Sequence, residues 1–371
     1  MKFTSIFFSA SASILEIYLK YTLSEYRVEV CFNIFYKDSP EGVHYSVHNN
    51  LKYVNSPIFR TTRHTITGLC ATFDNVMLSI LIPTYNFDCT PLAAELHRQI
   101  AACGITAEVI VMDDASPDVN VRNALKAIND LPHCRLVELP HNVGIARIRN
   151  LLADEAAYDF MLFLDSDVFP VTDNFVSDYI EARHSADVVC GGLLFRPTPP
   201  SPQCTLRYLY GSRIESQCVE ERMKQPYGQF RTLNFFINRK AFMATRFNEE
   251  FVRYGHEDTF FGKQLQHNGF TITHIDNPIY HDVPDTNEDF LSKTRRSIAN
   301  LKEHRDILTS HVRLLQLYHK LQRLHLQGLV AAAFSCIEKL LLHNLCSNKP
   351  SLLLFNVYKV GYLCRIMTAA Q

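Results

Sequence analysis

The chain has 371 residues, of which 47% are hydrophobic, so it can build one large domain or two ordinary ones around a sizeable core. Its formal net charge of -1 argues against a general nucleic-acid-binding protein, because such proteins present a strongly basic face. The eleven cysteines are scattered and form no C-x-x-C pair, which argues against a disulfide framework or a zinc site and favours a reducing, cytoplasmic compartment.

Residues 1–76 show no clear hydrophobic periodicity. They open with MKFTSIFFSASASIL, a weak signal-peptide pattern with an early lysine, a short apolar stretch and small residues. Met77 stands directly before a strong predicted strand. We therefore expect residues 1–76 to be an N-terminal extension and translation to start at Met77. The mass of the N-terminal peptide of the native protein tests this expectation.

From residue 78 onward, apolar runs alternate with helical periodicity. The run LSILIP (78–83) is rich in branched residues and indicates a buried strand. Thr90 and Pro91 suit the start of a helix, and Gly104 suits its end. The same reasoning predicts further strands at 108–112, 135–139, 159–164 and 187–192, and further helices around 124–128, 144–156 and 174–184.

This alternation with short connections predicts an α/β fold with an open, mostly parallel sheet flanked by helices. Ligands of such sheets bind at the carboxyl ends of the strands. Polar residues follow each of the first four expected strands, and we expect them to converge on one edge. They are Thr84, Tyr85 and Asn86; Asp113 and Asp114; His141 and Asn142; and Asp165, Ser166 and Asp167.

The second half changes character after Gly192, with a Pro-rich loop at 196–203. A strand leading into a helix is expected at 232–242, a loop and helix at 254–269, and a strand at 270–276. The chain is expected to be mainly helical toward its end, which gives domain boundaries of 1–76, 77–290 and 291–371. The last apolar and basic segment, 352–367, could pack on the core or lie on a membrane surface, and we favour packing.

Asp165 and Asp167 end an apolar run, where unpartnered carboxylates are rare. Their spacing of two places both side chains on the same side of an extended backbone. Such a pair suits a hard divalent cation, Mn²⁺ or Mg²⁺, shared with substrate phosphates. The alternative is a solvated loop without a ligand.

Five segments stand in the order and approximate spacing of the family 2 glycosyltransferases. They are SILIPTYN, VIVMDDASPD, NVGIARIRN, FLDSDVFP and YGHEDTFFG, and the resemblance covers about residues 78–285. The chain resembles this family. The resemblance implies the GT-A nucleotide-sugar fold, Rossmann-like in its sheet. It also implies an inverting enzyme of polysaccharide biosynthesis that moves a sugar from a UDP-sugar to a saccharide or lipid-linked acceptor.

The resemblance also implies roles for the residues at the first three strand ends. Thr84 and Tyr85 would line the nucleotide pocket. Asp113 or Asp114 would accept a hydrogen bond from the base, while the other would cap a helix. A second group would lie near the nucleotide and its phosphates: Asn142, Gly144 and Arg149. Arg149 is equally expected to be a structural ion-pair partner of Asp113 or Asp165.

Two acidic motifs would carry the chemistry. Asp165, Ser166 and Asp167 match the metal-binding Asp-x-Asp motif, in which Asp167 is the expected direct ligand and Asp165 contacts ribose or a metal-bound water. His281 matches the place of a third metal ligand in some relatives, although a lone histidine is more often structural.

The motif HED (256–258) would lie beside the acceptor. Asp258 is expected to be the general base, with Glu257 holding sugar hydroxyls. The alternative is that both acids complement a helix dipole. The chain has no Trp, so Tyr254 and Phe230 are the candidates for stacking on an acceptor sugar.

Two other classes compete with this interpretation. A nucleotidyltransferase would need a glycine-rich, basic loop after the first strand, and IPTYNFDCTP (82–91) has neither glycine nor Lys or Arg. A non-catalytic nucleotide-sugar-binding scaffold with a decayed site is disfavoured by the acids retained in both motifs. The expected location is cytoplasmic, with peripheral contact at the inner face of the membrane if the C-terminal region binds lipid.

Overall fold

The computed structural model describes residues 2–11, 14–23, 26–39, 42–54, 76–252, 255–281, 285–309 and 311–369, with side chains from Val76 onward. The chain divides into two compact units, Met1–Thr72 and Phe73–Gln371. The first unit is a four-stranded antiparallel sheet in the order β1-β2-β3-β4. Its strands are β1 (Lys2–Ser11), β2 (Ile14–Leu23), β3 (Tyr26–Ser39) and β4 (Gly42–Val54). Hydrophobic periodicity did not predict these strands, and the expected start at Met77 stays a prediction.

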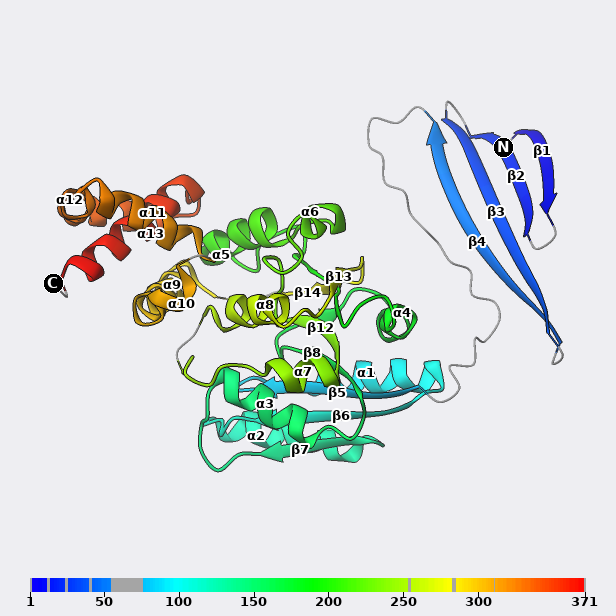
Figure 1. Ribbon diagram of the computed structural model, residues 1–371, viewed down its shortest axis with the longest axis horizontal. Coiled ribbons are helices and arrows are strands. Elements are labelled where there is room, and N and C mark those ends of the chain that lie inside the picture. The colour runs from blue at the N-terminus through cyan, green and yellow to red at the C-terminus, as the bar shows by residue number, and fades with distance from the viewer. Residues whose placement is uncertain are drawn as a thin grey trace. The chain divides into compact units, whose positions relative to one another are not determined.

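The second unit is built on a seven-stranded sheet in the order β13-β10-β12-β8-β5-β6-β7 (Figure 1). The first four strands of this sheet along the chain are all parallel, and β10 and β13 are parallel to each other. Only β12 runs antiparallel to both its neighbours. The predicted mostly parallel α/β sheet is therefore confirmed. The strands are β5 (Met77–Thr84), β6 (Thr106–Asp113), β7 (Cys134–Glu138), β8 (Phe160–Leu164), β10 (Val188–Cys190), β12 (Asn234–Asn238) and β13 (Ile272–His274).

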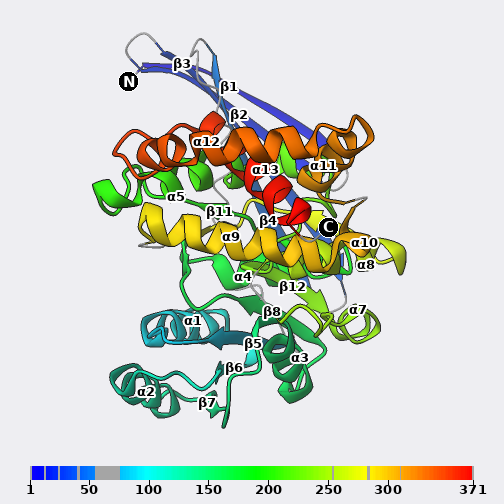
Figure 2. The ribbon, with the colours of Figure 1, turned by 90° about the vertical axis from the view of Figure 1, so that its left-hand side faces the viewer.

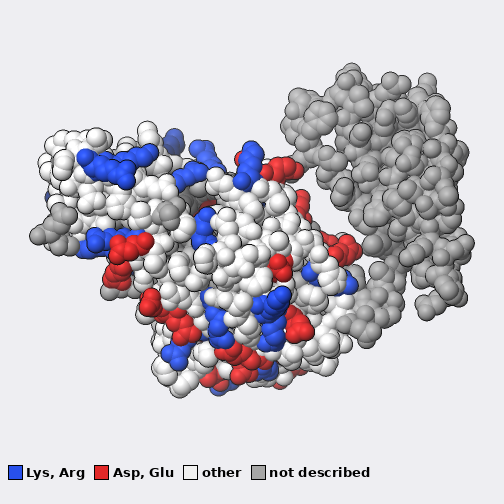
Figure 3. Space-filling model, viewed as in Figure 1, with Lys and Arg blue, Asp and Glu red and all other residues white. Residues whose placement is uncertain are grey.

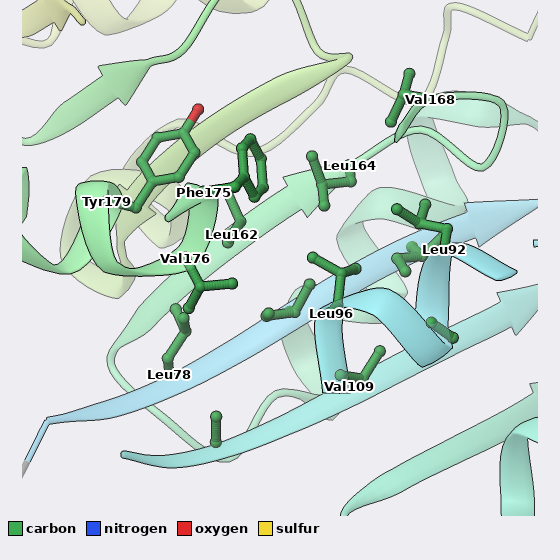
Figure 4. Close-up of a cluster of buried hydrophobic side chains, with 14 of the residues drawn as sticks. Leu78, Leu92, Leu96, Val109, Leu162, Leu164, Val168, Phe175, Val176 and Tyr179 are labelled. Carbon is green, nitrogen blue, oxygen red and sulfur yellow. The ribbon is translucent and has the colours of Figure 1, made fainter. Parts of the chain in front are cut away.

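Helices cover both faces of this sheet, so the strands are buried on both sides. Leu78 and Ile80 of β5 pack on the face that carries α1 (Thr90–Cys103) and α4 (Phe175–Ala182), as Figure 4 shows for Leu78. Leu81 packs on the opposite face. That face carries α3 (Ile145–Glu155), α7 (Arg239–Thr245) and α8 (Glu257–His267). Burial on both faces explains why β5 is a continuous apolar run and not an alternating one.

A small three-stranded sheet lies beside the main one, in the order β11 (Leu193–Leu194), β14 (Ile279–Tyr280) and β9 (Phe169–Pro170). The antiparallel pairing of β9 with β14 sets Tyr280 opposite Phe169. The remaining short helices are α2 (Val119–Leu125), the 3-10 turns Lys126–Asp130 and Pro202–Cys204, α5 (Thr205–Tyr210), the π turn Gly211–Glu215 and α6 (Val219–Met223).

The C-terminal region is helical, as predicted. It comprises α9 (Asn287–Glu303), α10 (Arg305–Leu308), α11 (Arg313–Arg323), α12 (Gln327–Leu345) and α13 (Leu352–Thr368). Figure 2 shows α13 lying between α12 and α9. Tyr358, Leu363 and Cys364 of α13 are fully buried, so this segment packs on the fold. Within the described residues, α12 alone is long and apolar enough to cross a membrane by length and composition.

The helix that carries the HED motif is anchored by its buried face. Leu265 of α8 is fully buried among the sheet and α7 side chains. Leu265→Ala is expected to lower the free energy of unfolding by about 2–5 kcal/mol, because it removes buried methyl groups and leaves a cavity. Urea unfolding measures this. The matched change Leu353→Ala, at a side chain that is 72% exposed, is expected to cost less than about 0.5 kcal/mol. Equal costs would contradict this placement of α8.

Candidate active site

The loops after β5 and β6 are joined at the carboxyl edge of the sheet. The amide of Asp114 donates to the carbonyl of Thr84 (2.9 Å), and the amide of Asn86 donates to Ser116 Oγ (2.6 Å). Thr84 is buried, and its hydroxyl donates to the carbonyl of Phe87 (2.8 Å). Tyr85 is 53% exposed. Of the two residues predicted to line a nucleotide pocket, Tyr85 is therefore the one that presents its side chain to solvent.

Asp113 and Asp114 hold two different loops. Asp113 accepts hydrogen bonds from the amide (3.2 Å) and hydroxyl of Ser116. Asp114 accepts from the amides of Val143 (2.7 Å) and Gly144 (3.0 Å), directly before α3. Asp114 thus anchors the loop that leads into α3, and the expectation that one member of the pair caps a helix stays a prediction. That Asp113 or Asp114 accepts a bond from a nucleotide base stays a prediction.

The third strand end joins the same edge through Asn142 and Gly144. The side-chain amide of Asn142 donates to the carbonyl of Asp114 (3.2 Å). Gly144 has φ of 86°, a left-handed conformation that other residues adopt only with strain. This glycine lets the chain turn sharply into α3 while its amide reaches Asp114. The loops after β6 and β7 therefore lie against each other, as the convergence argument predicted.

Arg149 connects the two acidic motifs. Its Nη2 donates to Asp165 Oδ1 (2.7 Å) and its Nη1 lies 3.4 Å from Glu257 Oε1. Only 1% of Arg149 is exposed, and its guanidinium lies over the ring of Phe247, 5.4 Å from the ring centre. Three elements, α3, β8 and α8, therefore meet at one buried cation. From the sequence, Arg149 was equally expected to contact the ligand or to form a structural ion pair. In the structure it forms an ion pair with Asp165. Its contact with Glu257 was not predicted.

Asp167 and His281 form a second pair, with 3.5 Å between Oδ2 and Nε2. The pairing of β9 with β14 brings them together, because Asp167 lies two residues before Phe169 and His281 follows Tyr280. Burial raises the pKa of Asp167, but the hydrogen bond and charge of His281 outweigh it and hold the pKa below its usual value. In the described ranges, no three His, Cys, Asp or Glu side chains gather as a ready-made metal cluster.

The other nitrogen of His281 constrains its chemistry. Nδ1 lies 3.3 Å from Nη2 of Arg207, which can only donate. A neutral ring with this contact carries its proton on Nε2 and donates it to Asp167. To bind a cation through Nε2, His281 must move its proton to Nδ1 and give up the Arg207 contact. Arg207 has an alternative acceptor in Glu215, which is 2.8 Å away.

The HED motif begins α8 through a tight turn tied to α9. His256 has φ of 73°, and its Nε2 lies 3.0 Å from Ser297 Oγ. Asn300 donates to the carbonyl of Gly255 (2.6 Å). Neither contact was predicted, because both join residues more than 40 positions apart. The turn fixes the direction in which the first residues of α8 point.

The two acids of this motif have different surroundings. Glu257 is 9% exposed, and its Oε2 is buried without a hydrogen-bond partner among the described residues. Burial, together with the neighbouring charge of Asp258, raises the pKa of Glu257 to about 7. Asp258 is only partly buried, and its Oδ1 accepts from the amide (2.6 Å) and hydroxyl (3.2 Å) of Thr259. Asp258 is therefore the acid of the two that solvent or a substrate can reach.

Glu257→Gln is expected to change how stability depends on pH. A carboxyl group whose folded pKa is about 7, against an ordinary 4.5, binds a proton more tightly in the folded state. The folded protein therefore loses stability as pH rises from about 4.5 to about 7, on the order of 3 kcal/mol in all. His256, whose pKa burial lowers to about 4, acts in the opposite direction.

The difference in unfolding free energy between the native protein and Glu257→Gln isolates the contribution of Glu257, because His256 is present in both. Urea unfolding across this pH range should show Glu257→Gln gaining stability relative to the native sequence as pH rises. A difference that stays constant with pH would contradict the raised pKa.

The expected stacking role of Phe230 is wrong. Its side chain is fully buried and packs against Phe235 and Phe261, so it cannot meet an acceptor sugar. Aromatic type alone suggested the role, whereas the ring fills the core below α8. Tyr254, the other candidate, lies outside the described residues.

Comparison with known proteins finds a family match over the central part of the chain. Residues 79–255 match the family model described as Glycosyl transferase family 2. This segment is therefore similar to the family 2 glycosyltransferases. This segment runs from within β5 to beyond β12, contains both Asp113–Asp114 and Asp165–Asp167, and ends directly before HED.

One curated protein to which the chain is similar is an "Uncharacterized glycosyltransferase" of Haemophilus influenzae, 32% identical over 101 residues. The match covers 26% of this chain and 38% of the relative, so the chain spans well under half of that protein.

Solved glycosyltransferases are similar at lower identity. The complex of S. aureus TarS 1–349 with UDP-GlcNAc is 19% identical, with a TM-score of 0.41, over 80% of this chain and 92% of that one. The mannosyltransferase PcManGT of Pyrobaculum calidifontis, in complex with GDP-Man and Mn²⁺, is 15% identical, with a TM-score of 0.49. This match covers 79% of this chain and 86% of that one. Because these TM-scores are below 0.5, the fold assignment rests on the sheet topology and the family match.

Proposed function

We propose that this chain is an inverting glycosyltransferase that moves a sugar from a nucleotide diphosphate sugar, a UDP-sugar by preference, to a saccharide or lipid-linked acceptor. The observation that carries the proposal is Arg149, one buried cation that contacts both Asp165 of the motif after β8 and Glu257 at the start of α8. This contact links Asp165, inside the segment that matches family 2, to Glu257, two residues beyond its end.

The donor would bind along the carboxyl edge of β5, β6 and β7. Tyr85 is exposed there for contact with a base or ribose. Asp113 and Asp114 keep acceptor capacity beyond their present bonds, because a carboxylate offers about four lone-pair sites. Asn142 and Gly144 lie on the loop after β7, and Ser166 lies on the loop after β8. This arrangement supports a nucleotide at the edge of the sheet.

The residues present fit a divalent cation in part. Asp167 has a lowered pKa and is therefore ionised at neutral pH, which suits Mn²⁺ or Mg²⁺. His281 would join it after releasing Arg207, and Asp165, held by Arg149, would contact the ion through water. When bound, such an ion supplies Lewis-acid stabilisation of the diphosphate leaving group.

Asp258 would be the general base. The acceptor hydroxyl transfers its proton to this carboxylate while the acceptor oxygen forms a bond to the anomeric carbon, and the bond from that carbon to the diphosphate breaks. Direct displacement inverts the anomeric configuration. Glu257, buried beside it and contacting Arg149, would fix the position of the α8 start and hold sugar hydroxyls.

Ligand binding tests the proposal before any acceptor is known. A bound donor stabilises the native state by mass action, about 2.7 kcal/mol at a hundred times its Kd. A thermal-shift screen of nucleotide sugars is therefore expected to raise Tm for at least one UDP-sugar, more with Mn²⁺ than with EDTA. Asp167→Asn should remove the Mn²⁺-dependent part and keep the rest. No shift with any nucleotide sugar would contradict the proposal.

A further inference from the structure

Helix α12 presents apolar side chains on both of its sides. Its inner side places Phe334, Leu341 and Leu345 in the core with Phe355 and Tyr358 of α13. Its outer side carries Leu329, 67% exposed, and Leu340, 72% exposed. The residues of this outer side recur at helical spacing: Leu329, Ala333, Cys336 and Leu340, all exposed. A helix that is apolar all round is ordinarily buried, so we expect the outer side of α12 to be covered by a binding partner.

Exposed apolar side chains also occur on the segments that precede and follow α12. The first turns of α13 expose Leu353 (72%) and Val357 (40%), and the α11–α12 connection exposes Leu324 (66%) and Leu326 (39%). These side chains and the outer side of α12 are called the C-terminal apolar face below. Single exposed leucines need no explanation, but this number on one helical hairpin and its connection is typical of an interaction site.

The charge around this face has one sign. Residues 311–369 carry seven Lys or Arg and one Glu, although the whole chain has a net charge of -1. Five of the seven remain for the surface: Arg313, Lys320, Arg323, Lys339 and Lys349. Of the other two, Lys359 lies over the rings of Tyr210 and Phe355, and Arg365 is neutralised by an acid. The single acid, Glu338, is paired with Arg365 (2.5 Å). On the face seen in Figure 3, Lys and Arg without Asp or Glu mark the helices α11 to α13 at the upper left.

We propose that the C-terminal apolar face docks on the surface of an anionic lipid bilayer. Exposed leucines flanked by lysines and arginines suit the boundary between acyl chains and negatively charged headgroups. A face that paired two copies of the chain would bring two sets of positive charges together, whereas a lipid surface neutralises them. The charge therefore selects the membrane over a second copy.

The geometry favours a helix that lies on the bilayer and not one that crosses it. By length and composition α12 could span a membrane, and 22% of its apolar window is buried. However, its inner side is held by Phe355 and Tyr358, and Gly361 of α13 lies directly against Phe334. Crossing would require α12 to leave these contacts, whereas docking uses only the outer side. This inference does not depend on the proposed sugar transfer.

Vesicle co-sedimentation of the full chain tests the docking. The protein should sediment with phosphatidylcholine–phosphatidylglycerol vesicles, much less with phosphatidylcholine alone, and less as salt rises. The double variant Leu329→Gln/Leu340→Gln should lower the partition coefficient by about tenfold or more. Lys339→Glu/Lys349→Glu should lower it severalfold on anionic vesicles only. The control Val119→Gln, at an apolar side chain 55% exposed on α2, should bind as the native sequence does.

Other outcomes overturn the proposal. Equal binding to neutral and anionic vesicles, or leucine variants that bind as the native protein does, would contradict it. Failure to bind any vesicle, with a stable dimer that Leu340→Gln converts to a monomer, would assign the face to a second copy. Thermal unfolding of each variant, expected to match the native protein because the changed side chains are exposed, excludes misfolding. Donor binding measured on the same samples reports the proposed function separately.

Discussion

Changing Asp258 to Asn is expected to lower the transfer rate about 10²- to 10⁴-fold and to leave the Kd for the donor unchanged, because a general base acts in the chemical step and not in donor binding. Asn keeps the size and the acceptor oxygen that faces Thr259 but cannot take up a proton. The helix α8 should therefore form as before. Initial rates with a saturating donor, together with a donor Kd from calorimetry, separate the two effects.

The control for this prediction is another acid at a helix start. Glu288 lies exposed in the first turn of α9, where it complements the helix dipole as Asp258 does in α8. Glu288→Gln should cost at most about 1 kcal/mol of stability and no activity. If Asp258→Asn behaves like Glu288→Gln, Asp258 is a helix-dipole residue and the assigned base is wrong.

Arg149→Met is expected to destabilise the fold by about 3–5 kcal/mol, because it leaves Asp165 and Glu257 without their shared cation in a buried site. The methionine fills a similar volume, so the loss of charge and not a cavity should dominate. Arg149→Lys should recover part of the loss, since one ammonium group cannot reproduce the two-sided contact of a guanidinium. Urea unfolding at constant pH gives the three free energies.

A surface pair of the same chemistry provides the comparison. Arg246 pairs with Asp154 at 2.7 Å, with side chains 38% and 47% exposed. Arg246→Met is expected to cost at most about 1 kcal/mol, because exposed ion pairs gain little over solvation. A loss for Arg149→Met no larger than that for Arg246→Met would show that Arg149 does not hold the two acidic motifs together.

Periodicity predicted the elements of the main sheet well because each has a local signal. The strand at 78–83 and the helix from Thr90 to Gly104 lie where the apolar spacing placed them, and Gly104 ends α1 in the left-handed conformation. The antiparallel direction of β12 was not predicted. Strand direction depends on how the chain returns to the sheet, and the 43 residues between β10 and β12 have no regular pattern that fixes this.

The contacts within the site were harder to predict than its position. The convergence of polar strand ends follows from a parallel sheet, and it located the edge correctly. Arg149 and Glu257, however, are 108 positions apart, and no local pattern encodes their approach. The pair Asp167–His281 depends on β9 and β14, which are two residues each and too short to show a period. The predicted stacking role of Phe230 was wrong because it rested on residue type alone, and residue type does not show whether a side chain is buried.

The most direct test of the account is the reaction itself. The purified full chain, incubated with Mn²⁺, a panel of UDP-sugars and saccharide or lipid-linked acceptors, is expected to release UDP in step with a glycosylated product. The anomeric coupling constant in the NMR spectrum of that product should be opposite in type to the donor's. A product that retains the donor configuration, or tight donor binding with no UDP release from any donor, would contradict the claim that this chain is an inverting glycosyltransferase.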